Sequence, residues 1–136
     1  MKRLVLLVLL IGLASTAAAT MAAGQGQPVP ILTGAYANTD SRGFGHVRPG
    51  VIYLGGDPSG LFCHIRWLSW GGQFAVGTGT GWFIPRNQPV AGGHQAPGVV
   101  VLYRLGTWQG VPAYTKLNWY FPQGGSTAGG VSHCTV

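Results

Sequence analysis

The chain has 136 residues, of which 46% are hydrophobic and only 7% charged, and this length suits one compact domain and not two. Of its eight basic and two acidic residues, Lys2 and Arg3 are adjacent near the N-terminus and the other eight lie singly along the chain. They do not form the clustered basic stripe that binding to a nucleic-acid backbone needs, so we expect no nucleic-acid partner.

The N-terminus has the form of an export signal. Lys2 and Arg3 precede an apolar run over residues 4–13, and small residues fill the segment 14–23. We predict a signal peptide over residues 1–23 and a secreted, extracellular mature protein. An uncleaved membrane anchor is the alternative, because the charge-free segment continues well past the apolar run. The strongly apolar part is too short for a stable span, so we expect none after cleavage.

The two cysteines, Cys63 and Cys134, are expected to form a disulfide. The compartment beyond the membrane is oxidising, and only one pairing is possible within the chain. Closing so long a loop contributes roughly 4 kcal/mol by restricting the unfolded chain. The bridge would place Cys134 on or beside a strand. A free, reactive thiol is the alternative.

The first part of the predicted mature chain has little regular structure. Residues 24–48 are rich in Gly, Pro, Ala, Asn and Ser and show no period, which predicts an irregular N-terminal arm. Residues 29–32 can add a short strand, which Pro28 and Pro30 restrict to a sheet edge. A second short strand is predicted over residues 51–54, and the GGDPSG segment after it predicts a turn.

Residues 61–84 are the predicted centre of the fold, with two strand-like runs joined by Gly71 and Gly72. The first run alternates between an apolar and a mixed face: Leu61, Cys63, Ile65 and Trp67 against Phe62, His64, Arg66 and Leu68.

In the second run one strand face is nearly bare, because it carries only Ala75, Gly77, Gly79 and Gly81. Glycines in a strand mark the close approach of another group. We expect the ring of Trp67 or Trp119 to lie across this face. A ligand ring is the alternative.

The remainder of the chain predicts three more strands. Residues 85–97 form a long loop rich in proline and glycine. Residues 99–105 are the clearest strand, residues 107–112 are a turn, and residues 113–121 alternate again. Residues 131–136 are predicted to return as a last strand that carries the second cysteine.

These short runs, broken by turn residues and without a helical period, predict an all-β fold. We expect a small antiparallel β-sandwich or partly open barrel of about six or seven strands with one disulfide. The chain then divides into the signal peptide at 1–23, the arm at 24–48 and a single β-domain at 49–136.

One stretch carries a resemblance. Its residues spell W-x-S-W-G followed by A-x-G-x-G: Trp67, Ser69, Trp70, Gly71, Ala75, Gly77 and Gly79. This pattern resembles that of small exported actinobacterial proteins of unknown function. They continue with a proline-containing loop, a valine-rich strand and a YTKL-like strand, which here correspond to residues 88–97, 99–105 and 114–117. The resemblance implies an exported, β-rich domain, and no activity can be transferred from it to any residue.

The residues needed for most hydrolytic chemistry are missing or scattered. Beyond residue 23 the only acids are Asp40 and Asp57, so a flanking carboxylate pair for glycoside hydrolysis is not expected. Asp57 precedes Pro58 in a turn, where aspartate commonly caps its own backbone. The four histidines are dispersed, and we expect neither a metal site nor a cofactor.

A serine nucleophile is the catalytic alternative. Ser69, His64 and Asp57 could supply the three residue types of a triad. In a regular strand, however, His64 and Ser69 point to opposite faces, since they are five positions apart. His94 is the other histidine that could serve a serine. A small secreted hydrolase with a Ser/His pair therefore stays open as a second hypothesis.

The strongest functional signal is aromatic. Fifteen aromatic residues are more than one small core can hide completely. The candidate binding residues lie at turns or on polar strand faces: Trp70, Trp82, Trp108, Tyr114 and Tyr120. Such rings suit stacking on sugars or gripping a peptide. The leading hypothesis is a non-catalytic exported domain that binds cell-wall glycan or an extracellular protein. A structural or inhibitory secreted protein is the third.

Overall fold

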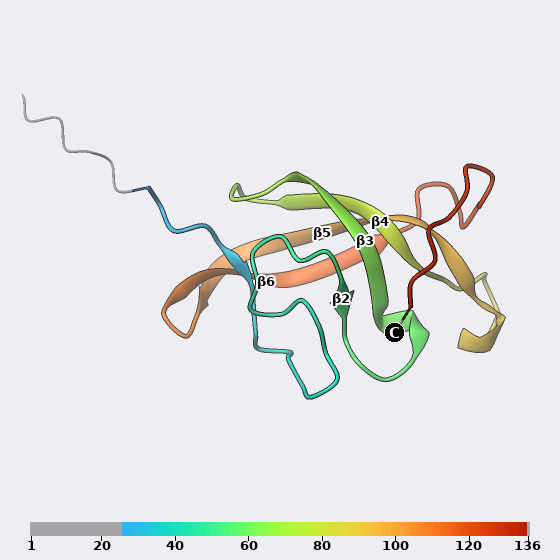
Figure 1. Cartoon of the computed structure of the whole chain (residues 1–136), viewed down its shortest axis with the longest axis horizontal. Coiled ribbons are helices and arrows are strands. Elements are labelled where there is room, and N and C mark those ends of the chain that lie inside the picture. The colour runs from blue at the N-terminus through green and yellow to red at the C-terminus, as the bar shows by residue number, and fades with distance from the viewer. Residues whose placement is uncertain (1–25, 136) are drawn as a thin grey trace, which may run out of the picture.

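In the computed structural model, which describes residues 26–135, six strands form one curled sheet (Figure 1). The strands are β1 (Ile31–Leu32), β2 (Ile52–Tyr53), β3 (Leu61–Ser69), β4 (Ala75–Phe83), β5 (His94–Trp108) and β6 (Val111–Tyr120). Two single 3₁₀ turns, η1 (Pro58–Gly60) and η2 (Val90–Gly92), interrupt the loops.

The order of the strands across the sheet is β1-β6-β5-β4-β3-β2. Neighbouring strands are antiparallel apart from the β1–β6 pair. The sheet curls into a half-barrel, so the prediction of an all-β, partly open barrel is confirmed. The predicted signal peptide, residues 1–23, lies outside the described residues. No helix among residues 26–135 is long and apolar enough to cross a membrane.

β5 begins earlier than predicted. Residues 94–97 were expected to belong to a loop, but Ala96 and Pro97 pair with Gly81 and Thr80 of β4. A proline has no N–H to give to a central strand. Pairing between β5 and β6 ends at Val99, opposite Tyr120, so at Pro97 the strand has a neighbour on one side only. The proline is tolerated because β5 is an edge at that point.

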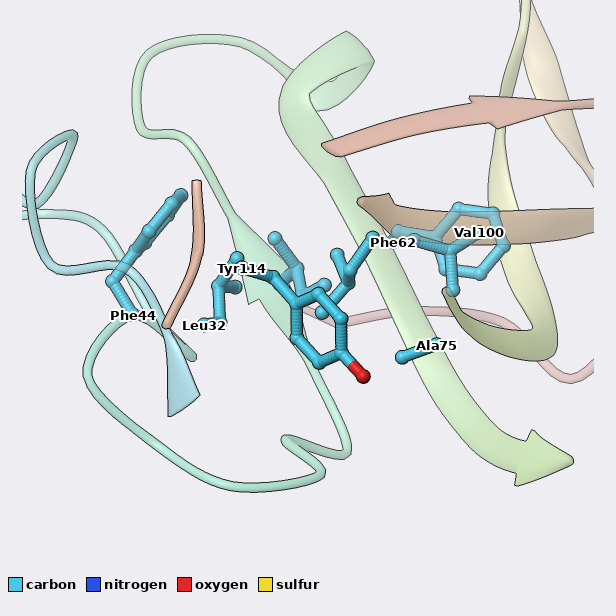
Figure 2. Close-up of a cluster of buried hydrophobic side chains, with 8 residues drawn as sticks. Leu32, Phe44, Phe62, Ala75, Val100 and Tyr114 are labelled. Carbon is cyan, nitrogen blue, oxygen red and sulfur yellow. The ribbon is translucent and has the colours of Figure 1, made fainter. Parts of the chain in front are cut away.

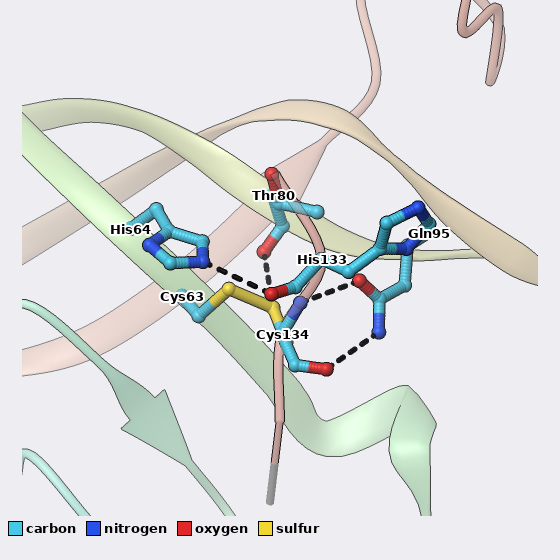
Figure 3. Close-up of a disulfide and its surroundings, with 6 residues drawn as sticks. All are labelled: Cys63, His64, Thr80, Gln95, His133 and Cys134. Carbon is cyan, nitrogen blue, oxygen red and sulfur yellow. Dashed lines mark hydrogen bonds between the residues drawn. A yellow bond between two sulfur atoms is a disulfide. The ribbon is translucent and has the colours of Figure 1, made fainter. Parts of the chain in front are cut away.

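The C-terminal segment forms no strand over residues 131–135, so the prediction of a last strand there is wrong. The predicted disulfide between Cys63 and Cys134 is present. The Cys134 N–H donates to Gln95 Oε1 at 2.6 Å, and Gln95 Nε2 donates to the Cys134 carbonyl at 3.1 Å (Figure 3). One side-chain amide thus supplies the donor and the acceptor that a neighbouring strand would have supplied.

The predicted division of the faces of β3 holds except at Phe62, which lies before a bulge. The register against β4 shifts between Cys63 and Arg66, and His64 between them has a φ of 51°. The extra residue changes the phase of the alternation at that point. Phe62, which was assigned to the mixed face, is fully buried in the core together with the partly buried Ile65.

The bare face of β4 accommodates rings from β3, as expected for a neighbour's side chain. A Cβ added at Gly79 or Gly81 would lie within 2.8 or 2.7 Å of the Phe62 ring. A Cβ at Gly77 would lie 3.0 Å from the Trp67 ring. Trp67 therefore lies on this face as expected, together with Phe62 and, beside Gly81, Phe121, and Trp119 is not among the rings that these glycines meet.

The core lies on the concave side of the sheet and includes residues of the arm. Leu32 and Phe44 pack there with Phe62, Ala75, Val100 and Tyr114, and the Tyr114 ring lies between Leu32 and Ala75 (Figure 2). β1 runs parallel to β6 and pairs Leu32 with Tyr114, which confirms the predicted edge strand. The arm is therefore part of the folded domain.

Candidate functional site

A cavity with a mostly apolar lining lies along β6, at the open side of the half-barrel. It has a volume of about 290 Å³. Its lining comes from β6, from the residue after β2 and from the arm: Tyr36, Leu54, Lys116, Leu117, Asn118 and Trp119. We call these six residues the seam groove, because they lie where the curled sheet fails to close.

The outer wall of the seam groove is fixed by polar contacts of the arm. Asn38 Nδ2 donates to the Leu54 carbonyl at 3.1 Å. Gly55 has a φ of 88°, and a Cβ there would lie 3.2 Å from Asn38 Oδ1, so the close approach favours glycine. On the other side, Lys116 Nζ donates to the Tyr36 hydroxyl at 3.4 Å. The first contact joins the arm to Leu54, and the second joins Tyr36 of the arm to β6.

The floor of the seam groove is continuous with the core. Trp119 stacks on the buried Phe62 with ring centroids 5.5 Å apart. Leu117 also packs against the core. Tyr36, by contrast, is 49% exposed at the rim. The groove therefore combines an apolar floor with one accessible ring and one ammonium group, from Lys116.

β6 has an open edge beside this groove. β1 pairs only with Ala113 and Tyr114. From Leu117 to Tyr120, β6 pairs with β5, and no other strand of the described residues covers its far side. The Trp119 N–H donates to Asn118 Oδ1 at 2.9 Å. A side chain thus holds this donor at the edge.

Of the five predicted binding residues, none lies among the residues that line the seam groove. Tyr114 is 0% exposed, so its prediction as an accessible binding ring is wrong. Its hydroxyl accepts from the Gly71 N–H at 2.9 Å and donates to the Gly72 carbonyl at 2.7 Å. Tyr114 therefore joins β6 to the β3–β4 turn, a role that strand alternation does not reveal.

The three predicted tryptophans are half-buried and make structural contacts. Trp70 Nε1 donates to the Pro30 carbonyl at 2.8 Å, and its ring meets those of Trp67 and Tyr114 edge to face. The Trp108 ring lies directly on Gly34 of the arm. These two rings fasten the arm to the ends of the hairpins.

Trp82 lies away from the arm, on the side of the sheet that carries the disulfide. Its Nε1 donates to the Val90 carbonyl at 2.9 Å. It also lines a smaller cavity of about 110 Å³ together with Gln95 and Cys134. Tyr120 is the fifth predicted residue and is 51% exposed on β6. Apart from Trp70 and the buried Tyr114, whose rings are in contact, the predicted residues lie in separate parts of the molecule and share no exposed surface.

The serine and histidines of the hydrolase hypothesis have separate partners. Ser69 Oγ accepts from the Val76 N–H at 3.1 Å. The Nε2 atoms of His64 and His94 lie 3.1 and 2.8 Å from the carbonyls of His133 and Gly125. The ring contacts attach the C-terminal segment to β3 and β5. Within residues 26–135, no three His, Cys, Asp or Glu side chains gather as a metal site.

Asp57 has a local structural role, as the turn signal predicted. Its carboxylate accepts from the Ser59 hydroxyl and, at 2.8 Å, from the Ser59 N–H at the start of η1. These two bonds, the hydroxyl first, lower the pKa of the Asp57 carboxyl below its ordinary value of 3.8. The charged carboxylate is therefore held by the turn, while the bond of the His64 ring is to the His133 carbonyl.

Sequence reasoning missed Tyr36 and Lys116, and it assigned Trp119 to the core alone. A signal for the site was present in Pro28 and Pro30, which limit β1 to a short edge strand and so leave most of β6 uncovered. It could not be used because the partner of β1 does not follow from one sequence.

Comparison with known proteins finds no matching family model, no similar curated protein and no similar solved structure. The resemblance of residues 67–79 to small exported actinobacterial proteins therefore stays a prediction.

Proposed function

We propose that this chain is an exported, non-catalytic binding domain that acts outside the membrane and holds a glycan or a segment of a protein in the seam groove. The observation that carries the proposal is the groove itself. An accessible ring, Tyr36, faces an apolar floor made by Leu117 and Trp119, with Lys116 at its side. Accessible rings with polar neighbours give a large contact area at low entropic cost.

Export is supported by the sequence of residues 1–23 and is compatible with the disulfide between Cys63 and Cys134. The described residues carry six basic and two acidic side chains, a net charge of +4. A mildly basic exported domain is attracted to anionic surfaces outside the cell. Such attraction would bring the domain to its ligand without specifying it.

The test compares two aromatic residues of similar exposure, one inside the seam groove and one outside it. Tyr36 is 49% exposed in the groove, and Phe74, just before β4, is 50% exposed and does not line the groove. Wild type, Tyr36→Ala and Phe74→Ala are passed over immobilised cell-wall polysaccharides and over an array of short peptides. We expect Tyr36→Ala to weaken the binding seen in wild type by about tenfold or more, and Phe74→Ala to leave it unchanged.

Equal losses in the two variants, or no binding by wild type to either class, would contradict the proposal. The hydrolase hypothesis is tested on the same samples with broad ester and peptide substrates. Turnover that disappears in His64→Ala or His94→Ala, and not in Tyr36→Ala, would replace a binding function with a catalytic one.

A further inference from the structure

We infer that the occupant of the seam groove is an extended segment of a protein partner, which adds to the sheet as a strand beside β6. This inference rests on the proposed function, because it names the ligand class of the same groove. It starts from the open edge of β6 between Leu117 and Tyr120, where the sheet has unused hydrogen-bonding capacity.

The backbone of β6 presents its groups to that edge. The Tyr114 carbonyl accepts from the Thr33 N–H at 3.0 Å, so in this strand a core-facing residue presents its backbone toward the β1 side. Leu117 and Trp119 also pack toward the core. In one strand of L-residues, all residues whose side chains point to the same face of the sheet direct their N–H and C=O groups to the same edge of the strand. Leu117 and Trp119 therefore direct their N–H and C=O groups to the open side.

The side-chain bond at Trp119 agrees with this direction. Its N–H donates to Asn118 Oδ1 at 2.9 Å, where the carbonyl of an added strand would otherwise accept. Asn118 is exposed, and a rotation of its side chain would release the donor. The edge is thus covered by one residue and not by a strand, a helix or a proline, which are the more permanent ways to block an edge.

The groove supplies side-chain contacts to match the backbone. In an added strand, every second side chain would lie over the apolar surface of Leu54, Leu117 and Trp119. Lys116 lies at the side of the groove and is its one charged lining residue. The chemistry favours a segment with alternating apolar residues and an acidic residue near Lys116.

A second copy of the chain is a poorer occupant than a different protein. Each copy has a net charge of +4 over its described residues, so pairing two β6 edges brings like charges together.

A glycan would use the groove differently. The amide of Asn118 would then be a direct hydrogen-bonding group for the sugar, whereas in strand addition it only has to leave the edge.

Asn118→Ala therefore distinguishes the two ligand classes. The probe is an array of extended peptides of about eight residues, a usual strand length, with alternating apolar residues and one aspartate. We expect the strongest peptide to bind wild type and to bind Asn118→Ala as tightly or more tightly. Its binding should slow amide hydrogen exchange at Leu117 and Trp119 by about tenfold or more. N-methylation of alternate peptide bonds in one register, and not the other, should abolish binding.

Three results would overturn the inference. In the first, peptides bind without slowing exchange at Leu117 and Trp119. In the second, purified polysaccharide binds, depends on Tyr36 and weakens in Asn118→Ala, in which case the proposed function survives and the strand addition does not. In the third, these amides are already protected in a dimer detected by analytical ultracentrifugation. If neither probe class binds through Tyr36, the proposed function fails as well.

Discussion

The contact between the Phe62 ring and Gly81 gives a quantitative test of the core. A Cβ added at Gly81 would lie 2.7 and 3.0 Å from Phe62 Cδ2 and Cε2, and 3.2 Å from Phe121 Cζ. All three atoms belong to rings, and Phe62 is fully buried, so it has little room to move. We expect Gly81→Ala to destabilise the domain by about 1–3 kcal/mol through overpacking.

The cost should depend on Phe62. Phe62→Ala alone should cost about 3–5 kcal/mol, since it leaves a cavity in the core. In that background the added methyl of Gly81→Ala meets no ring of Phe62, and replacing glycine restricts the unfolded chain. The second substitution should then be neutral or stabilise by about 0.4–1 kcal/mol. The coupling between the two positions is therefore about 1–4 kcal/mol.

The four proteins are compared by guanidinium denaturation followed by tryptophan fluorescence with the disulfide intact. Gly50→Ala is the control, because a Cβ there meets nothing within 4 Å. If Phe62→Ala does not fold, Phe62→Val removes the same clashing ring atoms. Equal costs of Gly81→Ala with and without the Phe62 ring would refute the assignment of this ring to the bare face of β4.

Three further outcomes follow from the same contacts. Tyr114→Phe removes the bonds to Gly71 and Gly72 and should lower the free energy of unfolding by about 1–2 kcal/mol, with denaturation as the measurement and Tyr36→Phe as the control. Reduction of the Cys63–Cys134 bridge, which closes 71 residues, should cost roughly 4 kcal/mol; an unchanged unfolding midpoint under reductant would contradict this. Asp57 has a lowered pKa, so its contribution to stability is present above 3.8 and is lost as the pH falls through its folded pKa; Asp57→Asn should flatten the acid side of the stability profile.

Much of the sheet follows from local sequence. The alternation in residues 61–69 and 75–83, with a glycine turn between them, predicts β3 and β4, because periodicity and turn chemistry depend on residues close together in the chain. The two cysteines predict the disulfide, because only one pairing is possible and an exported protein meets an oxidising compartment. The glycine face of β4 likewise predicts that a ring packs on it, and the structure supplies the rings.

The misassignments arise where one residue changes the phase of a strand. His64 inserts a bulge that moves Phe62 from the predicted surface to the centre of the core. On β6, Tyr114 is buried although Lys116 and Asn118, which share its face in a regular alternation, are exposed; Arg104 on β5, in the stretch that pairs with this part of β6, has a φ of 56°. Neither position carries a glycine or proline that would have indicated the irregularity.

The seam groove could not be predicted because it depends on strand order. Tyr36 and Trp119 are 83 positions apart in the printed numbering, and they meet because β1 joins the sheet beside β6 and then leaves it after two residues. One sequence does not specify that pairing. Predicting exposed rings from turns and strand faces therefore gave Trp70 and Trp108, which in the structure fasten the arm, and did not give Tyr36.

The central claim is that ligand occupies the seam groove, and a map of backbone amide shifts by NMR tests it most directly. Wild-type protein is titrated with the tightest ligand found among the peptides and polysaccharides. We predict that the largest shifts fall on Tyr36, Leu54 and residues 116–119, with little change around the smaller cavity beside Trp82. Shifts that gather at Trp82 and Gln95, with the groove residues unchanged, would contradict the account.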